Sequence, residues 1–295
     1  MPASDTPDPD AGATVELTLG DLRAGPPDRT SDLRDQLPGL EPQRHVTDWG
    51  RSERVEGLVD RTVYEFLFRY WFRAYVEGVE NVPGDGPALL VANHSGALPA
   101  DALMIGKAIR DGHRTPRTVQ LVVGEQHLGR LPGLAMLFTK LGGIPAHPAN
   151  LHRLLFDEGQ LALVFPEGSA ASRKPLKERY RLRPFDRTPF VQSAAAADAP
   201  IVPVAVVGAE EALPVFARLT ALERLPRMPM VPLAPVFPLP AKFKIRFLEP
   251  VSTGGLGGGS AREQRRASEL GEEIRALIQE NLFEMVAERR SVWLG

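Results

Sequence analysis

The chain has 295 residues, enough for one large domain or two small ones with a substantial buried core. It contains no cysteine, which excludes a thiol nucleophile, a cysteine-ligated zinc site and a disulfide framework, and fits a reducing cytoplasm. Its 35 basic and 37 acidic residues nearly cancel, but residues 1–50 hold ten acidic against four basic residues, so the remaining body is mildly basic. A basic body suits anionic substrates or lipid headgroups, although scattered solvated charges explain it equally well.

The first 50 residues are rich in Asp, Pro and Thr and poor in large apolar side chains, so we expect a disordered acidic tail over 1–50 and one folded domain over 51–295. The opening MPASDTPDPD has neither a charged n-region nor an apolar h-region, which argues against a signal peptide. No run of about 18 or more apolar residues occurs, so we expect no transmembrane helix. Any contact with a membrane would then be peripheral.

A helical pattern over residues 55–76 carries two apolar stripes. We predict that the first stripe packs on the core and that the second, interleaved with arginines, is an interfacial membrane surface. The first consists of Val59, Val63, Phe66, Leu67, Tyr70, Trp71 and Ala74, and the second of Tyr64, Phe68, Phe72 and Tyr75. Packing of another element on the second stripe is an equally good explanation, and both alternatives stay open.

Short apolar runs alternate with helical patterns through the rest of the chain. We predict strands near residues 88–92, 118–123, 161–165, 201–207 and 243–248. This alternation is typical of a single α/β domain with a largely parallel central sheet flanked by helices. In such sheets, ligands bind at the carboxyl ends of the strands.

Three later segments have simpler patterns. Residues 228–240 hold five prolines in an apolar context, which excludes a regular helix or central strand and favours a lid, a membrane-dipping loop or an irregular cover of the core. GGLGGGS at 254–260 is a flexible link. The closing helix over 261–290 has one packing stripe, made of Leu270, Ile274, Leu277, Ile278 and Met285.

Two polar corners follow predicted strands, NHSGALPAD at 93–101 and VFPEGS at 164–169. A neutral His94 can act as a general base, and a carboxylate on its far nitrogen, supplied by Asp101, would fix the tautomer and stabilise the imidazolium. Asp101 lies in the first turn of a helix that Pro99 is expected to start. Taken alone, Asp101 is equally well explained as charge compensation at a helix N-terminus, and His94 as a structural histidine.

Other reaction classes lack their motifs. There is no G-x-S-x-G nucleophile elbow, no P-loop, no convincing dinucleotide fingerprint and no nucleic-acid-binding motif. The remaining histidines have no metal-ligand spacing with carboxylates; those considered are His113, His127, His147 and His152. We therefore expect no metal and no nucleic-acid partner, and serine hydrolases, nucleotide enzymes and dehydrogenases are disfavoured.

Four motifs in order resemble a divergent bacterial branch of the lysophosphatidic acid acyltransferase family of phospholipid and glycerol acyltransferases. They are NHSGALPAD, LGGIPA at 141–146, VFPEGS and IVPVAVVG at 201–208, and the resemblance covers about residues 55–250. Two departures stand out. Six residues rather than four separate His94 from Asp101, and His147 and Ala170 occupy places where the family commonly has arginine.

The resemblance implies the glycerolipid acyltransferase fold and transfer of an acyl group from acyl-CoA or acyl-carrier protein to a hydroxyl of a glycerolipid or lysophospholipid, as in phospholipid biosynthesis. It implies no further cofactor, a lipid acceptor as partner, and a cytoplasmic location, peripheral on the inner face of the cell membrane. It implies that His94 with Asp101 is the base. The other implied site residues are Glu167, Gly168 and Ser169 for the acceptor, and backbone N–H groups near Gly143, Ile144 and Pro145 for the oxyanion.

Because these arginines are missing, a phosphate on the acceptor, if it carries one, would have to be bound by Arg173, Lys174 or Lys177. The plain alternative is that this basic run is a solvated segment. Two other functions stay open on the same fold, a non-catalytic lipid-binding protein and a lipid thioester or ester hydrolase. The stretched His94–Asp101 gap favours the former, and the distance between these two side chains separates it from an enzyme.

Overall fold

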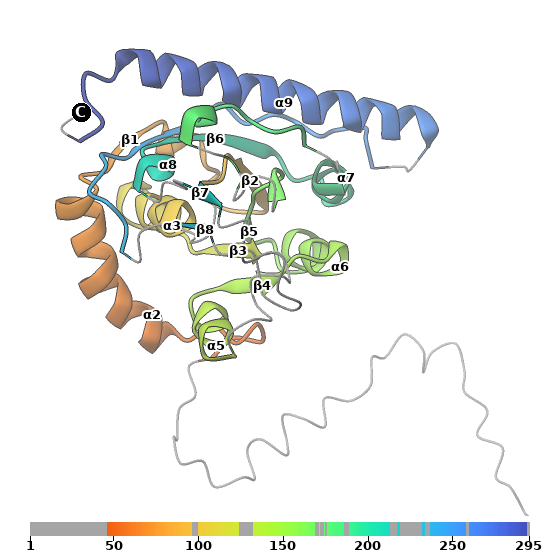
Figure 1. Cartoon of the computed structure of the whole chain (residues 1–295). Coiled ribbons are helices and arrows are strands. Elements are labelled where there is room, and N and C mark those ends of the chain that lie inside the picture. The colour runs from red at the N-terminus through yellow and green to blue at the C-terminus, as the bar shows by residue number, and fades with distance from the viewer. Residues whose placement is uncertain are drawn as a thin grey trace, which may run out of the picture. The chain divides into compact units, whose positions relative to one another are not determined.

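Buried apolar runs form a seven-stranded central sheet with the strand order β1-β9-β6-β2-β5-β3-β4 (Figure 1). Its strands are β1 (Tyr75–Glu77), β2 (Ala88–Ala92), β3 (Val119–Val123), β4 (Gly143–Pro145), β5 (Leu161–Val164), β6 (Ile201–Val207) and β9 (Lys244–Phe247). The described strands pair in parallel except for β6 and β9, which are antiparallel. The predicted α/β domain with a largely parallel sheet is therefore confirmed.

The computed structural model describes residues 46–95, 100–123, 132–168, 171, 174, 176–185, 189–212, 217–218, 232–233, 237–257 and 260–293. Residues His45–Gly295 form one unit. Of the predicted tail over 1–50, residues 1–45 lie outside the described residues, and for them the tail stays a prediction. Within the described part, the Trp49 indole N–H donates to both carboxylate oxygens of Glu158 at 3.0 and 2.8 Å.

Helices cover both faces of the sheet (Figure 1). The longer ones are α2 (Glu53–Val59), α3 (Ala100–Gly112), α5 (Pro132–Lys140), α7 (Pro189–Ala196) and α9 (Ala261–Glu288). Shorter helical turns are η1 (Asp60–Tyr64), η2 (Phe66–Trp71), η3 (Val79–Asn81), α6 (Pro148–His152), η4 (Arg153–Asp157), η6 (Leu176–Glu178) and α8 (Ala209–Ala212). A separate antiparallel pair joins β7 (Ala217–Arg218) to β8 (Pro232–Leu233).

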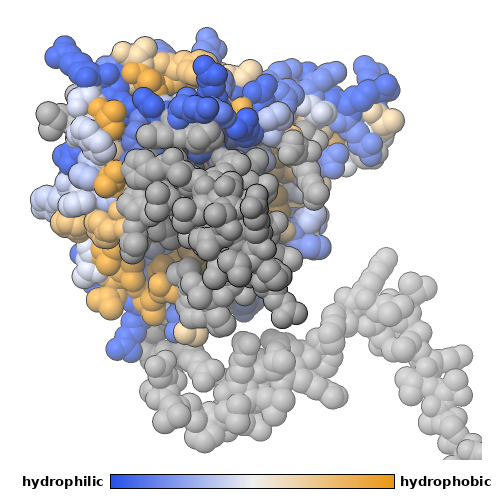
Figure 2. Space-filling view, viewed as in Figure 1, coloured by the Kyte–Doolittle hydropathy of each residue, from blue (hydrophilic) through white to orange (hydrophobic). Residues whose placement is uncertain are grey.

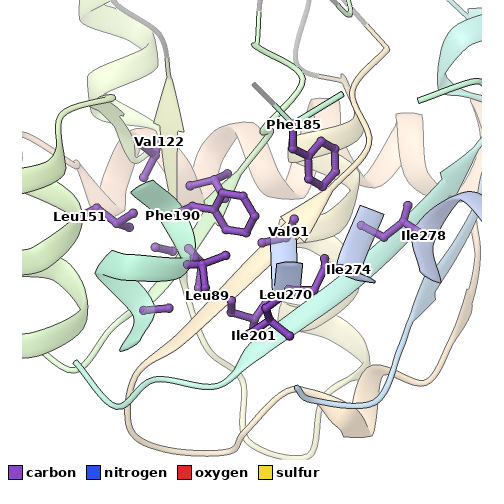
Figure 3. Packing of buried hydrophobic residues seen from close by; sticks show 14 of the residues in the cluster. Leu89, Val91, Val122, Leu151, Phe185, Phe190, Ile201, Leu270, Ile274 and Ile278 are labelled. Atoms are coloured by element: carbon purple, nitrogen blue, oxygen red, sulfur yellow. The ribbon is translucent and has the colours of Figure 1, made fainter. Parts of the chain in front are cut away.

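The central strand β2 is buried on both faces, as parallel strands covered by helices are. Its side chains alternate between two cores. Leu89 and Val91 pack in the core that includes α7 and α9, where Figure 3 shows them near Ile201 and Leu270. Leu90 and Ala92 pack in the second core, which includes α3 and β9. The end of β2 is thus held from both sides, which fixes the backbone that follows it.

The closing helix begins where its sequence predicts. Ser260 and Glu263 form a reciprocal capping box at the start of α9, which satisfies backbone N–H groups that the first turn leaves unpaired. Of the predicted packing stripe, Leu277 is only half-buried. The four other members are buried: Leu270, Ile274, Ile278 and Met285.

The first helical run ends earlier than predicted. It covers Glu53–Val59 and then continues through wider π-helical turns to Trp71. Arg73 adopts a positive φ of 44°, which reverses the chain and lets Tyr75 begin β1 beside Lys244. The expected helix over 55–76 was therefore wrong at its last turn, because the pairing of β1 with β9 overrides local helix propensity.

Each stripe of this run is divided between the core and the surface. In the second stripe, Phe72 and Tyr64 are buried, and the ring of Phe72 packs 4.3 Å from that of Phe243, whereas Tyr75 is exposed. For Phe72 and Tyr64, therefore, the packing alternative holds and the membrane-facing one was wrong.

In the first stripe, Val63, Phe66 and Tyr70, predicted to face the core, are exposed. The prediction holds for its other described members that pack on the core: Leu67, Trp71 and Ala74.

Candidate active site

The two polar corners meet at one edge of the sheet. β2 and β5 are neighbouring parallel strands, so their carboxyl ends lie together, and Asn93–Ser95 follows one strand as Phe165–Gly168 follows the other. The ring of Phe165 lies 4.5 Å from the His94 ring, centroid to centroid. The predicted location of both corners at the carboxyl ends of adjacent strands is thus seen in the structure.

Asn93 anchors the corner to β6. Its side-chain amide donates to the Val206 carbonyl at 2.9 Å, and its carbonyl accepts from the Val206 N–H at 2.8 Å. The side chain therefore imitates a strand partner where β2 itself has ended. Sequence reasoning had missed this role, although an asparagine directly after a fully buried strand is the kind of signal that identifies it.

His94 and Asp101 are in direct contact. The His94 Nδ1 lies 2.9 Å from the Asp101 Oδ2, which also accepts from the Ser95 N–H at 2.8 Å and the Ser95 hydroxyl at 3.1 Å. The other oxygen of Asp101 accepts from the Ala102 N–H at 2.9 Å. Asp101 thus reaches His94 across the long gap; the residues between them, 96–99, lie outside the described residues.

The surroundings of the pair favour an ionised Asp101 and a basic His94. Burial by itself would raise the pKa of Asp101, but His94 and the N–H groups of Ser95 and Ala102 outweigh it and lower that pKa. Burial by itself would lower the pKa of His94, but the charges of Asp101 and Glu167 raise it above its ordinary value. Because an ionised carboxylate accepts from Nδ1–H, the Nε2 lone pair is left to take a proton.

Glu167, which follows β5, is hydrogen-bonded to the backbone of His94. One carboxylate oxygen accepts from the His94 backbone N–H at 3.3 Å, and the other accepts from the Arg183 N–H at 2.8 Å. The Lys174 ammonium lies 3.1 Å from the latter oxygen, and the Glu167 side chain is fully buried. The carboxylate predicted to contact the acceptor is therefore bonded to the protein itself.

Lys174 does not fit its predicted role as a phosphate ligand. Its ammonium is buried and paired with both Glu167 and Glu210, so two of its three donors are already engaged. Lys177 is exposed. Arg173 and Ser169, predicted to bind the acceptor, lie outside the described residues. Gly168 is exposed and has a φ of +53°, a conformation that favours glycine at this corner.

Gly143, Ile144 and Pro145 lie elsewhere than predicted. They form β4 at the far edge of the sheet, and β3 and β5 separate it from β2. At the usual strand spacing, the backbone of β4 is roughly 14 Å from that of β2. The predicted oxyanion role for these N–H groups is therefore not supported, because motif order along the chain does not determine strand order in the sheet.

No metal centre is evident in the described part of the chain, where no group of three or more His, Asp or Glu side chains is arranged to hold an ion.

The chain is similar in sequence to known proteins. The sequence profile of the Acyltransferase family matches residues 73–207, a span that contains His94, Asp101 and Glu167. An uncharacterised protein of Mycobacterium tuberculosis is 36% identical over 97% of this chain and 82% of its own length. The bovine "DGAT1/2-independent enzyme synthesizing storage lipids" is 28% identical over 48% of this chain and 41% of its own.

Among solved structures, the crystal structure of the 1-acyl-sn-glycerophosphate acyltransferase PlsC of Thermotoga maritima superimposes with a TM-score of 0.53. The superposition covers 81% of this chain and 80% of the PlsC chain, at 22% sequence identity, and so supports a shared fold. The family profile identifies residues 73–207 as an acyltransferase domain and the fold agrees with it, so the chain carries a domain of the acyltransferase family.

Proposed function

We propose that this acyltransferase moves a fatty acyl group from acyl-CoA or acyl-carrier protein to a hydroxyl of a glycerolipid or lysophospholipid. The observation that carries the proposal is the buried His94–Asp101 contact of 2.9 Å, which engages Nδ1 and so leaves Nε2 to accept a proton. A general base oriented by a carboxylate is the group that such a transfer needs.

In the proposed reaction, His94 Nε2 takes the proton of the acceptor hydroxyl as its oxygen attacks the thioester carbonyl carbon. The tetrahedral intermediate collapses with cleavage of the carbon–sulfur bond, and the thiolate takes the proton from the imidazolium. The products are an oxygen ester and a free thiol, and no acyl-enzyme forms. Asp101 stabilises the imidazolium while it exists.

A lipid product analysis tests the proposal. The protein is incubated with acyl-CoA or acyl-carrier protein and, separately, lysophosphatidic acid, other lysophospholipids, diacylglycerol or aminolipids, and products are identified by mass spectrometry. We expect an acylated lipid that depends on one acceptor class. Free fatty acid without any ester would instead identify the hydrolase alternative, and no turnover with every pair would contradict acyl transfer to these lipids.

The pH dependence of the reaction follows from the state of His94. Only the neutral imidazole can accept a proton, so kcat/KM is expected to rise with pH and level off above the His94 pKa. Because Asp101 and Glu167 raise that pKa above 6.5, the acid limb should lie above 6.5. Asp101→Asn removes the charge that raises the His94 pKa most, and so should move the acid limb to lower pH. An acid limb that stays in place would show that it does not report the protonation of His94.

We further propose that the protein docks peripherally on a membrane through an apolar face made of Val63, Phe66, Tyr70 and Phe237. These side chains are 50%, 46%, 70% and 56% exposed. The indole of Trp71 connects the two parts of the face, because its ring meets that of Phe237 edge-on at 5.3 Å. Figure 2 shows apolar side chains gathered over this part of the molecule, where Figure 1 places α2.

Large exposed apolar clusters mark interaction surfaces, and aromatic side chains suit the membrane interface. No helix among the described residues is long and apolar enough to cross a membrane. From the predicted loop 228–240, the described residues 237–240 contribute Phe237 to the face, and the Pro238 carbonyl accepts the Trp71 indole N–H at 2.9 Å. Most of the rest of that loop lies outside the described residues.

Serine substitutions test the docking face. The double variant Phe66→Ser/Tyr70→Ser should bind anionic phospholipid vesicles at least roughly tenfold more weakly, because two apolar contacts with the interface are lost. Its thermal midpoint should stay that of wild type. The matched control Phe72→Ser should lose roughly 3 kcal/mol or more of folding free energy instead, since that ring is fully buried. Unweakened sedimentation of the double variant with vesicles would rule out this face.

A further inference from the structure

A buried ionic cluster lies directly behind the proposed active site. The Lys174 ammonium is 3.1 Å from a carboxylate oxygen of Glu167 and 3.2 Å from one of Glu210. All three side chains are almost inaccessible, with exposures of 2%, 0% and 7%. One positive charge therefore faces two negative charges in a dry environment, and the cluster ends on the carboxylate that accepts the His94 N–H.

Each member of the cluster belongs to a different part of the fold. Glu167 follows β5, Glu210 lies in α8 after β6, and Lys174 lies between them in sequence. The second oxygen of Glu210 accepts from the Tyr180 N–H at 3.1 Å, and the Tyr180 hydroxyl accepts from the Gly208 N–H at 2.8 Å. The cluster thus ties the ends of two central strands to the segment that follows the VFPEGS corner.

Such a cluster is a poor source of stability. Removing charges from water is expensive, and well-packed apolar side chains can often replace a buried ion pair without loss of stability. The position of the cluster gives a better explanation of why it is present, because Glu167 accepts the backbone N–H of His94, the proposed base. Without a cation, Glu167 and Glu210 would be two like charges side by side, and their repulsion would push the Glu167 carboxylate away from the His94 N–H.

We propose that Lys174 is a positioning residue for acyl transfer: by pairing with Glu167 and Glu210 together, it keeps the Glu167 carboxylate aimed at the His94 backbone N–H. This inference rests on the proposed His94 mechanism. It differs from phosphate binding in a measurable way, because a positioning residue acts on the rate of the chemical step, whereas a phosphate ligand acts mainly on the acceptor KM.

The charges around Glu210 support this assignment. Burial raises the pKa of Glu210 to about 7, the neighbouring charge of Glu167 raises it too, and Lys174 opposes both. Other charged groups flank the cluster. His94 and Asp101 lie beyond Glu167, and Glu211, with its partners Arg179 and Arg289, lies on the other side of α8.

Four variants test the proposal. Lys174→Met removes the ammonium, and Lys174→Arg keeps a cation. Lys174→Met/Glu210→Gln removes the ammonium together with one carboxylate, so that Glu167 no longer faces a like charge. Arg181→Met is the matched control, an exposed basic residue of the same segment. Acceptor KM and kcat are measured for each between about pH 6 and 9, and every value is compared with wild type at the same pH.

Lys174→Met should lower kcat roughly 100-fold near neutral pH, as expected when a catalytic group is displaced, while the acceptor KM stays within about threefold. Lys174→Arg and the double variant should recover kcat to within roughly tenfold of wild type, and Arg181→Met should match wild type. Because the double variant contains no like-charge pair, it remains informative if Lys174→Met fails to fold.

Two results would overturn the inference. The first is a raised acceptor KM with an unchanged kcat in Lys174→Met, which would make Lys174 a substrate ligand. The second is a double variant that folds but stays as inactive as Lys174→Met at every pH. That result would mean that the Lys174 ammonium acts directly and not by positioning Glu167.

A stability measurement tests the cluster independently of activity. Because folding raises the pKa of Glu210 from 4.5 to about 7, the folded protein holds a proton that the unfolded chain has released, and stability falls as the pH rises through that window. Glu210→Gln should flatten this fall in the thermal midpoint between about pH 5 and 8. An unaltered slope would contradict the cluster.

The two proposals fail in different ways. If His94→Ala keeps full activity while Glu210→Gln flattens the stability slope, the acyl-transfer mechanism is wrong and the ionic cluster stands. If His94→Ala is inactive while Lys174→Met behaves as wild type, only the positioning role is wrong.

Discussion

Replacing His94 with alanine is expected to reduce acyl transfer by roughly 10³–10⁴-fold, the upper range for losing a positioned general base. The acceptor hydroxyl then has no group in the site to take its proton as it attacks the thioester. The fold should persist, because Asp101 keeps the Ser95 N–H, the Ser95 hydroxyl and the Ala102 N–H as donors after the imidazole is gone. Initial rates of ester formation, with circular dichroism to monitor the fold, measure the effect.

The matched control is His152→Ala. His152 is exposed and stacks on Phe156 with a centroid distance of 5.0 Å, away from the proposed chemistry, so this variant should keep wild-type activity. Full activity in His94→Ala would end the mechanism proposed here. A loss of activity in both variants together with a lowered thermal midpoint would point to the fold and not to the base.

Replacing Asp101 with asparagine is expected to lower kcat by several orders of magnitude, as in other histidine–carboxylate pairs. Both Asp101 oxygens accept hydrogen bonds, one from His94 and Ser95 and the other from the Ala102 N–H. The asparagine NH₂ must occupy one of the two positions, and there it faces an N–H group. A neutral amide also cannot stabilise the imidazolium that forms when His94 takes the proton.

Asp111→Asn is the control on the same helix, because that aspartate is exposed and pairs with Lys107 at 3.1 Å near the end of α3. It should leave kcat within about twofold of wild type, as surface ion pairs contribute little. Activity of Asp101→Asn within tenfold of wild type would show that His94 does not need its carboxylate. That outcome would return His94 to a structural role.

Much of the site can be predicted from sequence, because its essential part is local. His94 and Asp101 come from one strand–turn–helix segment, and both polar corners directly follow apolar runs that can only be buried strands. Parallel strands bring their carboxyl ends to one edge, so the meeting of the two corners follows from the alternation of strands and helices. The acyltransferase resemblance depended on the same residues.

The sequence alone thus determined five of the seven strands of the sheet, the histidine–carboxylate pair and the family resemblance. Tertiary structure decided which side chains of the first helical run are buried, because both stripes have helical spacing and only contacts such as that of Phe72 with Phe243 separate them. It also decided that β4 lies at the edge of the sheet and that Lys174 is enclosed between Glu167 and Glu210. These contacts join distant parts of the chain, and no local pattern encodes such contacts. A basic run therefore looks solvated in sequence even where one of its lysines is buried behind the active site.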